Sequence, residues 1–101
     1  MDSTIEEAIK YAIEEHKKNN LTKAERLYRN ILKVKPTQGV ANHNLGVMLV
    51  DLHQSKNALP FLKTALEENK NVQQFWVSYI RALINLDELD KASEFIELAK
   101  K

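Results

Sequence analysis

Apolar residues recur every three or four positions along most of the chain, the spacing that places them on one face of an α-helix. Ile5, Ile9 and Ile13 begin the first such stripe, and Leu21 begins a second one after a polar break at residues 19–20. The same succession of stripe and break continues along the chain. It predicts six helices, at residues 4–18, 22–35, 39–52, 56–69, 72–86 and 88–100.

Short polar motifs indicate where these helices begin. Ser3 and Glu6 have the spacing of a capping box, in which each side chain bonds the backbone amide of the other residue. Thr22 and Glu25 repeat that spacing at the second helix. The candidate N-caps of the later helices are Ser55, Asn57 and Asp87.

Asn and Pro residues indicate where helices end. The Asn pair at 19–20 tolerates the left-handed conformation with which many helices terminate. Pro36 disfavours a helical conformation at Lys35, so the second helix should stop there. Pro60 is expected in the first turn of its helix, where a missing amide costs little, and this makes Asn57 the better cap.

The apolar pattern repeats along the chain. Ala24, Ala58 and Ala92 are spaced by 34 residues. Apolar residues share this spacing in further triplets: Tyr11, Leu45 and Tyr79; Leu27, Phe61 and Phe95; Tyr28, Leu62 and Ile96; Ile31, Ala65 and Ala99. Gly46 and Ala12 are small enough to let the two helices of a repeat approach closely.

One helical hairpin cannot bury its apolar stripe alone, whereas stacked hairpins can. The sequence therefore predicts a single all-α domain over residues 1–101. Its architecture is a right-handed α-solenoid of three helix–turn–helix repeats, at about residues 5–38, 39–72 and 73–101.

Composition and charge exclude several classes of protein. The 15 basic residues nearly balance the 14 acidic ones, so the basic surplus of a nucleic-acid binder is missing. The sequence has no Cys, which excludes disulfides and thiolate metal sites. Residues 1–7 are acidic, unlike a signal peptide, and no apolar run approaches the ~18 residues of a membrane span. We expect a cytoplasmic protein with neither nucleic-acid nor membrane partners.

The chain carries no catalytic or metal-binding motif of the Ser-elbow, phosphate-loop or His-Glu type. Its three histidines, His16, His43 and His53, lack the spacing of a helical zinc pair. The adjacent carboxylates diverge on their helices and are interpreted as solvated: Glu6-Glu7, Glu14-Glu15 and Glu67-Glu68. We expect no enzymatic activity, no cofactor, no metal and no small-molecule substrate.

The repeat resembles the tetratricopeptide repeat, which has a bulky residue, a Leu-Gly pair, an aromatic residue, Ala, Phe, Ala and Pro at set positions. The residues that match are Leu45-Gly46, Ala58 and Ala65 in the middle repeat, Tyr11, Ala12, Ala24, Tyr28 and Pro36 in the first, and Trp76, Tyr79, Ala92, Ile96 and Ala99 in the third. Ala8 and Ile80 depart from the pattern. The resemblance covers nearly the whole chain and implies a protein-interaction scaffold.

Residues 41–47 are more specifically similar to the repeats of O-linked N-acetylglucosamine transferases and of bacterial repeat proteins with a transferase domain. In those proteins an Asn before the Leu-Gly pair bonds the backbone of a bound peptide, and Asn44 occupies that position. Lys10 and Ser78 stand there in the other repeats, so one rung of such a ladder is present. A second branch of the family holds the C-terminal carboxylate of chaperones. Of its positions, here Ile9, Ile13, Asn44, Gln74 and Ser78, only Asn44 matches.

In this family the first helix of each repeat lines a concave face. The resemblance therefore implies a protein- or peptide-binding groove formed by Ile9, Ile13, His16, His43, Asn44, Val47, Val50, Val77, Arg81 and Ile84. The apolar character of the set favours an interface, and the alternative is that several members pack between neighbouring first helices. Asn44 either bonds a peptide backbone or is solvated. A surface ion pair is preferred for Arg81, and packing for Trp76.

The last predicted helix has more apolar residues than one buried stripe needs. Phe95 and Leu98 should stay partly uncovered, which predicts an interface at the C-terminal edge with a second copy or with more of a longer parent protein. The alternative is that Glu97, Lys100 and Lys101 screen them. We expect a docking or dimerisation module of a larger transferase-like bacterial protein or, alternatively, a stand-alone peptide-binding adaptor.

Overall fold

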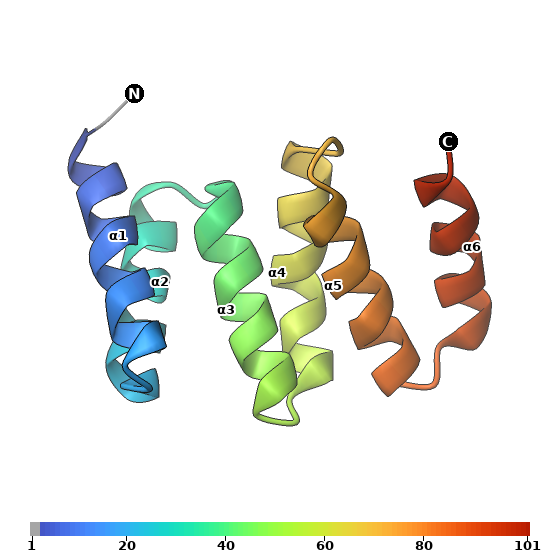
Figure 1. Ribbon diagram of the computed structural model, residues 1–101, viewed down its shortest axis with the longest axis horizontal. Helices are drawn as coiled ribbons and strands as arrows, with labels where there is room; N and C mark the ends of the chain where they lie inside the picture. The colour runs from blue at the N-terminus through green and yellow to red at the C-terminus, as the bar shows by residue number, and fades with distance from the viewer. Residues whose placement is uncertain (1–2) are drawn as a thin grey trace.

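A computed structural model describes residues 3–101, with only the backbone of Ser3. These residues form six α-helices: α1 (Ser3–Lys17), α2 (Leu21–Val34), α3 (Gly39–Asp51), α4 (Ser55–Glu68), α5 (Gln73–Asn85) and α6 (Leu89–Ala99). Figure 1 shows them side by side in chain order, over 39 × 29 × 20 Å. The predicted all-α solenoid is confirmed, and every helix begins and ends within one residue of its predicted bounds. Among the described residues, no helix is both long and apolar enough to cross a bilayer.

The helices pack as three consecutive hairpins. α1 packs on α2, α3 on α4 and α5 on α6, while contacts of α2 with α3 and of α4 with α5 join one hairpin to the next. One core runs through all three, and its largest fully buried side chains are Tyr28, Leu45, Met48, Leu49, Leu62 and Leu83. Ala24, Ala58 and Ala92 are all buried, which confirms that the repeated alanines lie between helices.

Gly46 shows how closely the helices of the middle hairpin approach. A Cβ atom at this position would lie 2.5 Å from the Leu62 side chain, closer than any real Cβ contact. The predicted need for a small residue between α3 and α4 is therefore confirmed.

The three hairpin turns share a left-handed residue, which the sequence predicted only at the first turn. Asn19, His53 and Asp87 have φ of 65°, 62° and 61°. At each turn the following amide bonds the carbonyl five residues back: Asn20 to Glu15, Gln54 to Leu49 and Glu88 to Leu83, at 2.9, 2.7 and 2.9 Å. These are Schellman-type helix ends, and Asn, His and Asp are the non-Gly residues most often found left-handed. The turn geometry therefore repeats although the residue type does not.

The predicted N-caps are wrong, because the Schellman turns place the helix starts elsewhere. Thr22, Ser55 and Asn57 lie inside helices. The N-cap residues are Asn20, Gln54 and Glu88, and none of them makes a side-chain capping bond. Asp87 is the left-handed turn residue. The side chain of Ser3 lies outside the described residues, so its capping box stays a prediction.

Pro60 lies in the second turn of α4 and not in the first, as the sequence predicted. Its ring removes one helical amide from the interior of the helix. α4 nevertheless continues to Glu68, and the Thr64 hydroxyl donates to the Pro60 carbonyl at 2.9 Å. Burial of Ala58 and Leu62 on both sides of Pro60 stabilises the helix against this loss.

Candidate interaction surfaces

A chain of hydrogen bonds connects the three hairpins. The Tyr28 hydroxyl of α2 lies 3.3 Å from Nδ1 of His16 in α1 and 3.3 Å from Nδ2 of Asn44 in α3. Next to Asn44, the ring of His43 lies 3.3 Å from the Asn44 Oδ1 atom and 2.7 Å from the Ser78 hydroxyl in α5. We call these five residues the polar chain.

The polar chain has a consistent direction of donation. Asn44 Oδ1 can only accept, so Nδ1 of His43 carries the hydrogen and its Nε2 accepts from Ser78. The Tyr28 hydroxyl accepts from Asn44 and can donate to His16. Burial lowers the pKa of His43, against the smaller raising effect of Asn44, and burial raises the pKa of Tyr28. Both shifts favour the neutral forms that this direction requires.

The polar chain changes the role expected of Asn44. The side chain is half-buried, its Nδ2 donates to Tyr28, and its Oδ1 accepts from His43. It is therefore not the freely solvated amide that was the alternative interpretation. One N–H and further lone pairs stay available. Its bond to a peptide backbone stays a prediction.

The other predicted groove residues separate into three groups. Ile9, Ile13, His16, His43 and Val47 are half-buried on α1 and α3. Val50 is buried, so it belongs to the core and not to an open groove. Val77, Arg81 and Ile84 are exposed on α5. The set therefore spans three levels of exposure, and a binding groove formed by its accessible members stays a prediction.

Arg81 borders an open hollow of about 750 Å³ between the α3–α4 turn and the end of α5. Asp51 and Asn85 also line this hollow. Over residues 3–101 no ion pair engages Arg81, so the preferred interpretation of a surface ion pair is not supported. No group of three His, Cys, Asp or Glu side chains within the described residues is placed to hold a metal ion.

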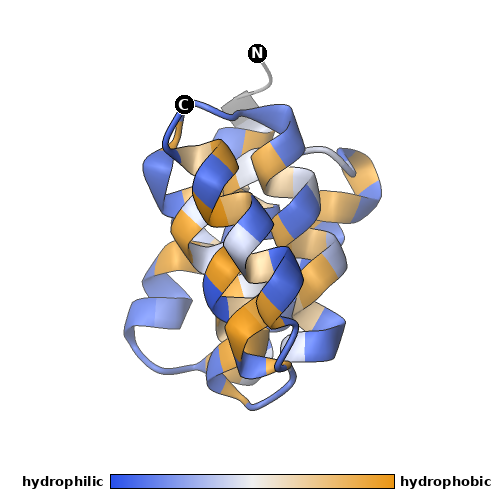
Figure 2. Cartoon of the chain, turned by 90° about the vertical axis from the view of Figure 1, so that its right-hand side faces the viewer, coloured by the Kyte–Doolittle hydropathy of each residue, from blue (hydrophilic) through white to orange (hydrophobic). Residues whose placement is uncertain are grey.

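Val77 and Ile84 lie together with apolar residues of α6 at the end of the array. Val77 is 46% exposed, Ile84 49%, Leu89 54% and Ile96 39%. Figure 2 looks onto this end and shows hydrophobic segments on the helices nearest the viewer. We call these four residues the end face.

The same four positions are covered one repeat earlier. The residues 34 positions before Ile84, Leu89 and Ile96 are Val50, Ser55 and Leu62, which are 7%, 8% and 0% exposed. The equivalent of Val77 is His43, whose ring lies 4.8 Å from that of Phe75 in α5. In the middle hairpin, therefore, a following first helix covers this surface. The end face is that surface without its cover.

Phe95 and Leu98 lie on a different surface from the end face. Phe95 is half-buried, with its ring centre 4.8 Å from that of Tyr79 and 6.3 Å from that of Trp76. Leu98 is exposed and borders a groove between α4 and α6. Because each helical residue turns by about 100°, Leu98 and Ile96 point in nearly opposite directions. The predicted C-terminal edge of Phe95 and Leu98 is therefore a separate surface from the end face.

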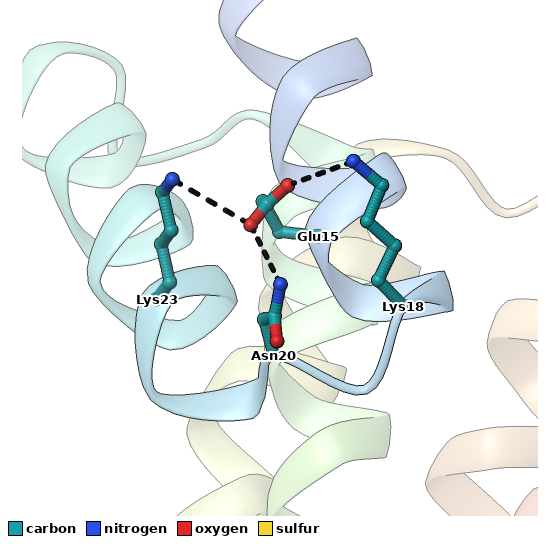
Figure 3. A network of polar contacts seen from close by, with 4 residues as sticks. All are labelled: Glu15, Lys18, Asn20 and Lys23. Carbon is teal, nitrogen blue, oxygen red and sulfur yellow. Dashed lines mark hydrogen bonds and ion pairs between the residues drawn. The ribbon is translucent and has the colours of Figure 1, made fainter.

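Glu15 corrects the interpretation of the adjacent carboxylates as solvated, because its side chain is buried. Its oxygens lie 3.0 Å from Asn20 Nδ2 and 3.6 Å from the ammonium groups of Lys18 and Lys23. Figure 3 shows the three side chains pointing toward the carboxylate. The bond from Asn20 lowers the pKa of Glu15 most, and the two lysines add to this against the raising effect of burial. Glu15 therefore stays ionised and ties α1 to the start of α2.

Sequence reasoning missed Glu15, Leu89 and Ile96, although comparison across repeats contains the signal. Glu15 stands 34 residues before the core residue Leu49, so it lies at a buried position. Leu89 and Ile96 lie at positions whose cover is completed by a following helix in the middle hairpin.

The chain was compared with known proteins. The family model of the tetratricopeptide repeat matches residues 49–101, just over half of the chain. No curated protein matches.

Several solved structures share the fold. The TPR2B domain of yeast Sti1, in a complex with pHsp70, has a TM-score of 0.86 and 22% identity, over 97% of this chain and 78% of that one. A double mutant of MamA from RS-1 has a TM-score of 0.85 and 20% identity, over 98% and 56%. MamA from Desulfovibrio magneticus RS-1, from residue 41 to its end, gives 0.83 and 21%, over 94% and 54%. The chain thus spans little more than half of the MamA chains.

Proposed function

Because the chain belongs to the tetratricopeptide repeat family, we propose that it is a protein-interaction scaffold whose main docking surface is the end face. The observation that carries this proposal is the exposure of Ile96, at the position where Leu62 is fully buried. Solenoids of stacked hairpins are soluble when their terminal helices present polar outer faces. An apolar end of this kind favours an interface.

The partner that fits the end face is an amphipathic helix. The helices that cover the equivalent surfaces inside the molecule are α3 and α5. Both carry uncharged buried residues at i, i+4 and i+7: Ala41, Leu45 and Met48 in α3, and Phe75, Tyr79 and Ala82 in α5. A docked helix with the same pattern reproduces a contact that the fold already makes.

More specifically, we propose that the chain is a docking or dimerisation module of a larger, transferase-like bacterial protein. Residues 1–101 then form one domain, with repeats at about residues 5–38, 39–72 and 73–101. The support is the similarity of residues 41–47 to the repeats of such transferases. The docked helix then belongs to the parent protein or to a second copy.

A peptide of residues 37–52 tests the docking surface, because it contains α3 and its N-cap Gln38. Fluorescence anisotropy of the labelled peptide should show saturable binding to the protein. Ile96→Glu should abolish binding, because a carboxylate replaces the central apolar contact. Val34→Glu is the matched control, since Val34 is 72% exposed and lies far from the end face on α2. Equal binding by the Ile96→Glu protein contradicts the proposal.

Light scattering separates a second copy from other partners. A doubled molar mass at two concentrations about tenfold apart, returning to the monomer in the Ile96→Glu variant, supports a two-fold dimer through the end face. A monomer at both concentrations contradicts dimerisation, and the docked helix then belongs to another segment or protein.

The second candidate function is a stand-alone peptide-binding adaptor. The polar chain favours it, because it holds His43 and Asn44 of α3 half-buried, bonded to α5 and α2 respectively, with some hydrogen-bonding capacity left. The structure of the Sti1 domain, which is in a complex with pHsp70, has the same fold. If the chain is an adaptor, we expect Asn44→Ala to weaken its binding of a peptide and Ile96→Glu to leave that binding unchanged.

A further inference from the structure

Two grooves run along the face formed by the second helices, one per step of the repeat. The first lies between α2 and α4, with about 260 Å³ of space lined by Arg29, Leu32, Lys33 and Phe61. The second lies between α4 and α6, with about 380 Å³. Its lining includes the residues 34 positions later, Lys63, Leu66, Glu67 and Phe95, together with Lys70, Trp76, Leu98 and Lys101.

A cation closes the first groove. The Arg29 guanidinium lies 5.5 Å from the centre of the Phe61 ring, and Glu25 holds it by an ion pair of 2.9 Å. Such stacking covers the apolar face of the ring. In the first groove the Phe61 ring is therefore covered by the protein's own side chain.

The second groove has no such cover. Its equivalent of Arg29 is Lys63, which makes no cation contact with Phe95 among the described residues. Trp76 replaces Asn42 and Leu98 replaces Thr64, so the second groove is also more apolar than the first, and its space is larger, about 380 Å³ against about 260 Å³. The Trp76 indole donates its N–H to the Lys70 carbonyl at 2.8 Å, which fixes the ring in the groove wall.

The rim of the second groove is positively charged. Lys63, Lys70 and Lys101 border it, against Glu67 alone. Within residues 3–101 none of the three lysines takes part in an ion pair, whereas Lys18, Lys23 and Lys100 do. Free ammonium groups around an apolar floor attract a ligand that is apolar in the centre and anionic at its flanks.

From this geometry we propose that the groove between α4 and α6 binds a short acidic peptide segment with two apolar anchors. The volume lies in the range of ligand sites, and the apolar floor with its rim of lysines fits a peptide segment that carries apolar anchors between carboxylates. The anchors occupy the floor made by Leu66, Trp76, Phe95 and Leu98, and the carboxylates meet the lysines. This site is distinct from the end face and does not depend on it.

Trp76 makes the proposal directly measurable, because it is the single Trp of the chain. The probe is a peptide of about twelve residues with Leu and Phe one helical turn apart and Glu at most other positions. We expect a saturable change in Trp76 emission that weakens when salt is raised to about 0.5 M. The matched peptide with Lys in place of every Glu should bind at least about tenfold more weakly.

Variants separate this site from the end face. Leu98→Glu should abolish the emission change. The double variant Lys63→Gln, Lys70→Gln should weaken it without disturbing the fold, because both lysines are exposed. Ile96→Glu and Lys91→Gln are the controls and should bind the acidic peptide as the parent chain does.

Three results would overturn the proposal: no emission change with the acidic peptide, equal binding of both peptides, or loss of binding in Ile96→Glu alone. A molar mass that doubles only with intact Leu98 also overturns it, because the occupant is then a second copy.

Discussion

The outer face of α1 and the end face of α5 and α6 lie at opposite ends of one array, and their surfaces differ in kind. On α1 the positions that carry Ala41, Leu45 and Met48 in α3 are occupied by Glu7, Tyr11 and Glu14. Both glutamates are exposed. Tyr11, the remaining apolar group, is 43% exposed and has the Lys23 ammonium 5.0 Å above its ring.

The end face has no comparable cover. Its residues are Val77, Ile84, Leu89 and Ile96, all exposed. The two ends therefore follow the same backbone repeat but differ in a few side chains. Those side chains decide which end is compatible with water and which favours a partner.

The first hairpin also differs from the other two at a buried position. Glu15 in α1 takes the position of Leu49 and Leu83, and all three are nearly inaccessible to solvent. A carboxylate is tolerated there because Asn20, Lys18 and Lys23 surround it. At this buried position, a carboxylate is thus compatible with the fold only when nearby side chains supply hydrogen bonds and opposite charges.

Exchanging the residue types of Glu15 and Leu49 should give the largest effect on stability. Leu49→Glu places a carboxylate at the Glu15 position one repeat later, without its three partners, and should lose about 3–5 kcal/mol of unfolding free energy. Glu15→Leu restores the apolar residue of the other repeats and should leave the melting temperature unchanged or raised. Thermal unfolding followed by circular dichroism compares them. Similar losses in both variants would show that the two positions do not differ.

Truncation at one repeat position should give the next largest effect. Leu62→Ala removes a fully buried side chain and should cost about 2–5 kcal/mol. Ile96→Ala, at the same position of the last hairpin, should cost less than about 1 kcal/mol because its side chain is already partly hydrated. Urea titrations of both variants measure the difference. A cost at Ile96 as large as that at Leu62 contradicts an uncovered end face.

The pH dependence of stability should show two separate windows. The pKa of His43 is below 6.5 in the folded chain, so the unfolded chain takes up the proton first and stability falls as pH drops below about 6.5. The pKa of Glu15 is below 4.5, so its contribution is present above pH 4.5 and is lost as pH falls through its folded pKa.

His43→Gln should remove the upper window, and Glu15→Gln should remove the lower one. His53→Asn is the control for the first, because Asn tolerates the left-handed turn and His53 lies outside the polar chain. Urea midpoints measured from about pH 2 to pH 8 test both windows. An unchanged upper window in His43→Gln would assign it to another group.

Lys23→Gln should give the smallest effect. It removes the cation above Tyr11 and one ion pair of Glu15, and the effect is small because the Lys23 side chain is itself 49% exposed, so that water screens both contacts. We expect a small fall in melting temperature, whereas Lys91→Gln on α6 should cause none. A fall as large as that of Leu62→Ala would mean that Lys23 has a structural role beyond covering this end.

Much of the fold follows from the sequence, because helical periodicity and the 34-residue spacing are properties of many residues at once. The helix caps did not follow from it. Thr22, Ser55 and Asn57 have suitable side chains, but the turns are set by backbone geometry at Asn19, His53 and Asp87. The position of Pro60 did not follow either, because burial of the helix outweighs the loss of one amide hydrogen bond inside it.

The sequence predicts the candidate interaction surfaces less completely than it predicts the fold. The family resemblance implies one groove that includes Val50, Val77 and Ile84. Whether such a residue is covered depends on which helix follows it, and this is a property of the array. Val50 is therefore buried, whereas Val77 and Ile84 are exposed. The hydrogen bond from Ser78 to His43 likewise spans two hairpins and has no local signal.

Extending the chain tests the end face most directly. A copy of residues 34–52 placed after Lys101 continues the 34-residue register, because Lys101 occupies the position of Lys33 and Glu67. If the copy of α3 docks on Val77, Ile84, Leu89 and Ile96, the melting temperature should rise by at least about 5 °C.

The matched control carries Glu in place of the copied Ala41, Leu45 and Met48 and should show no rise. An unchanged melting temperature for the uncharged extension, or the same rise for both extensions, would contradict an end face built to accept a helix.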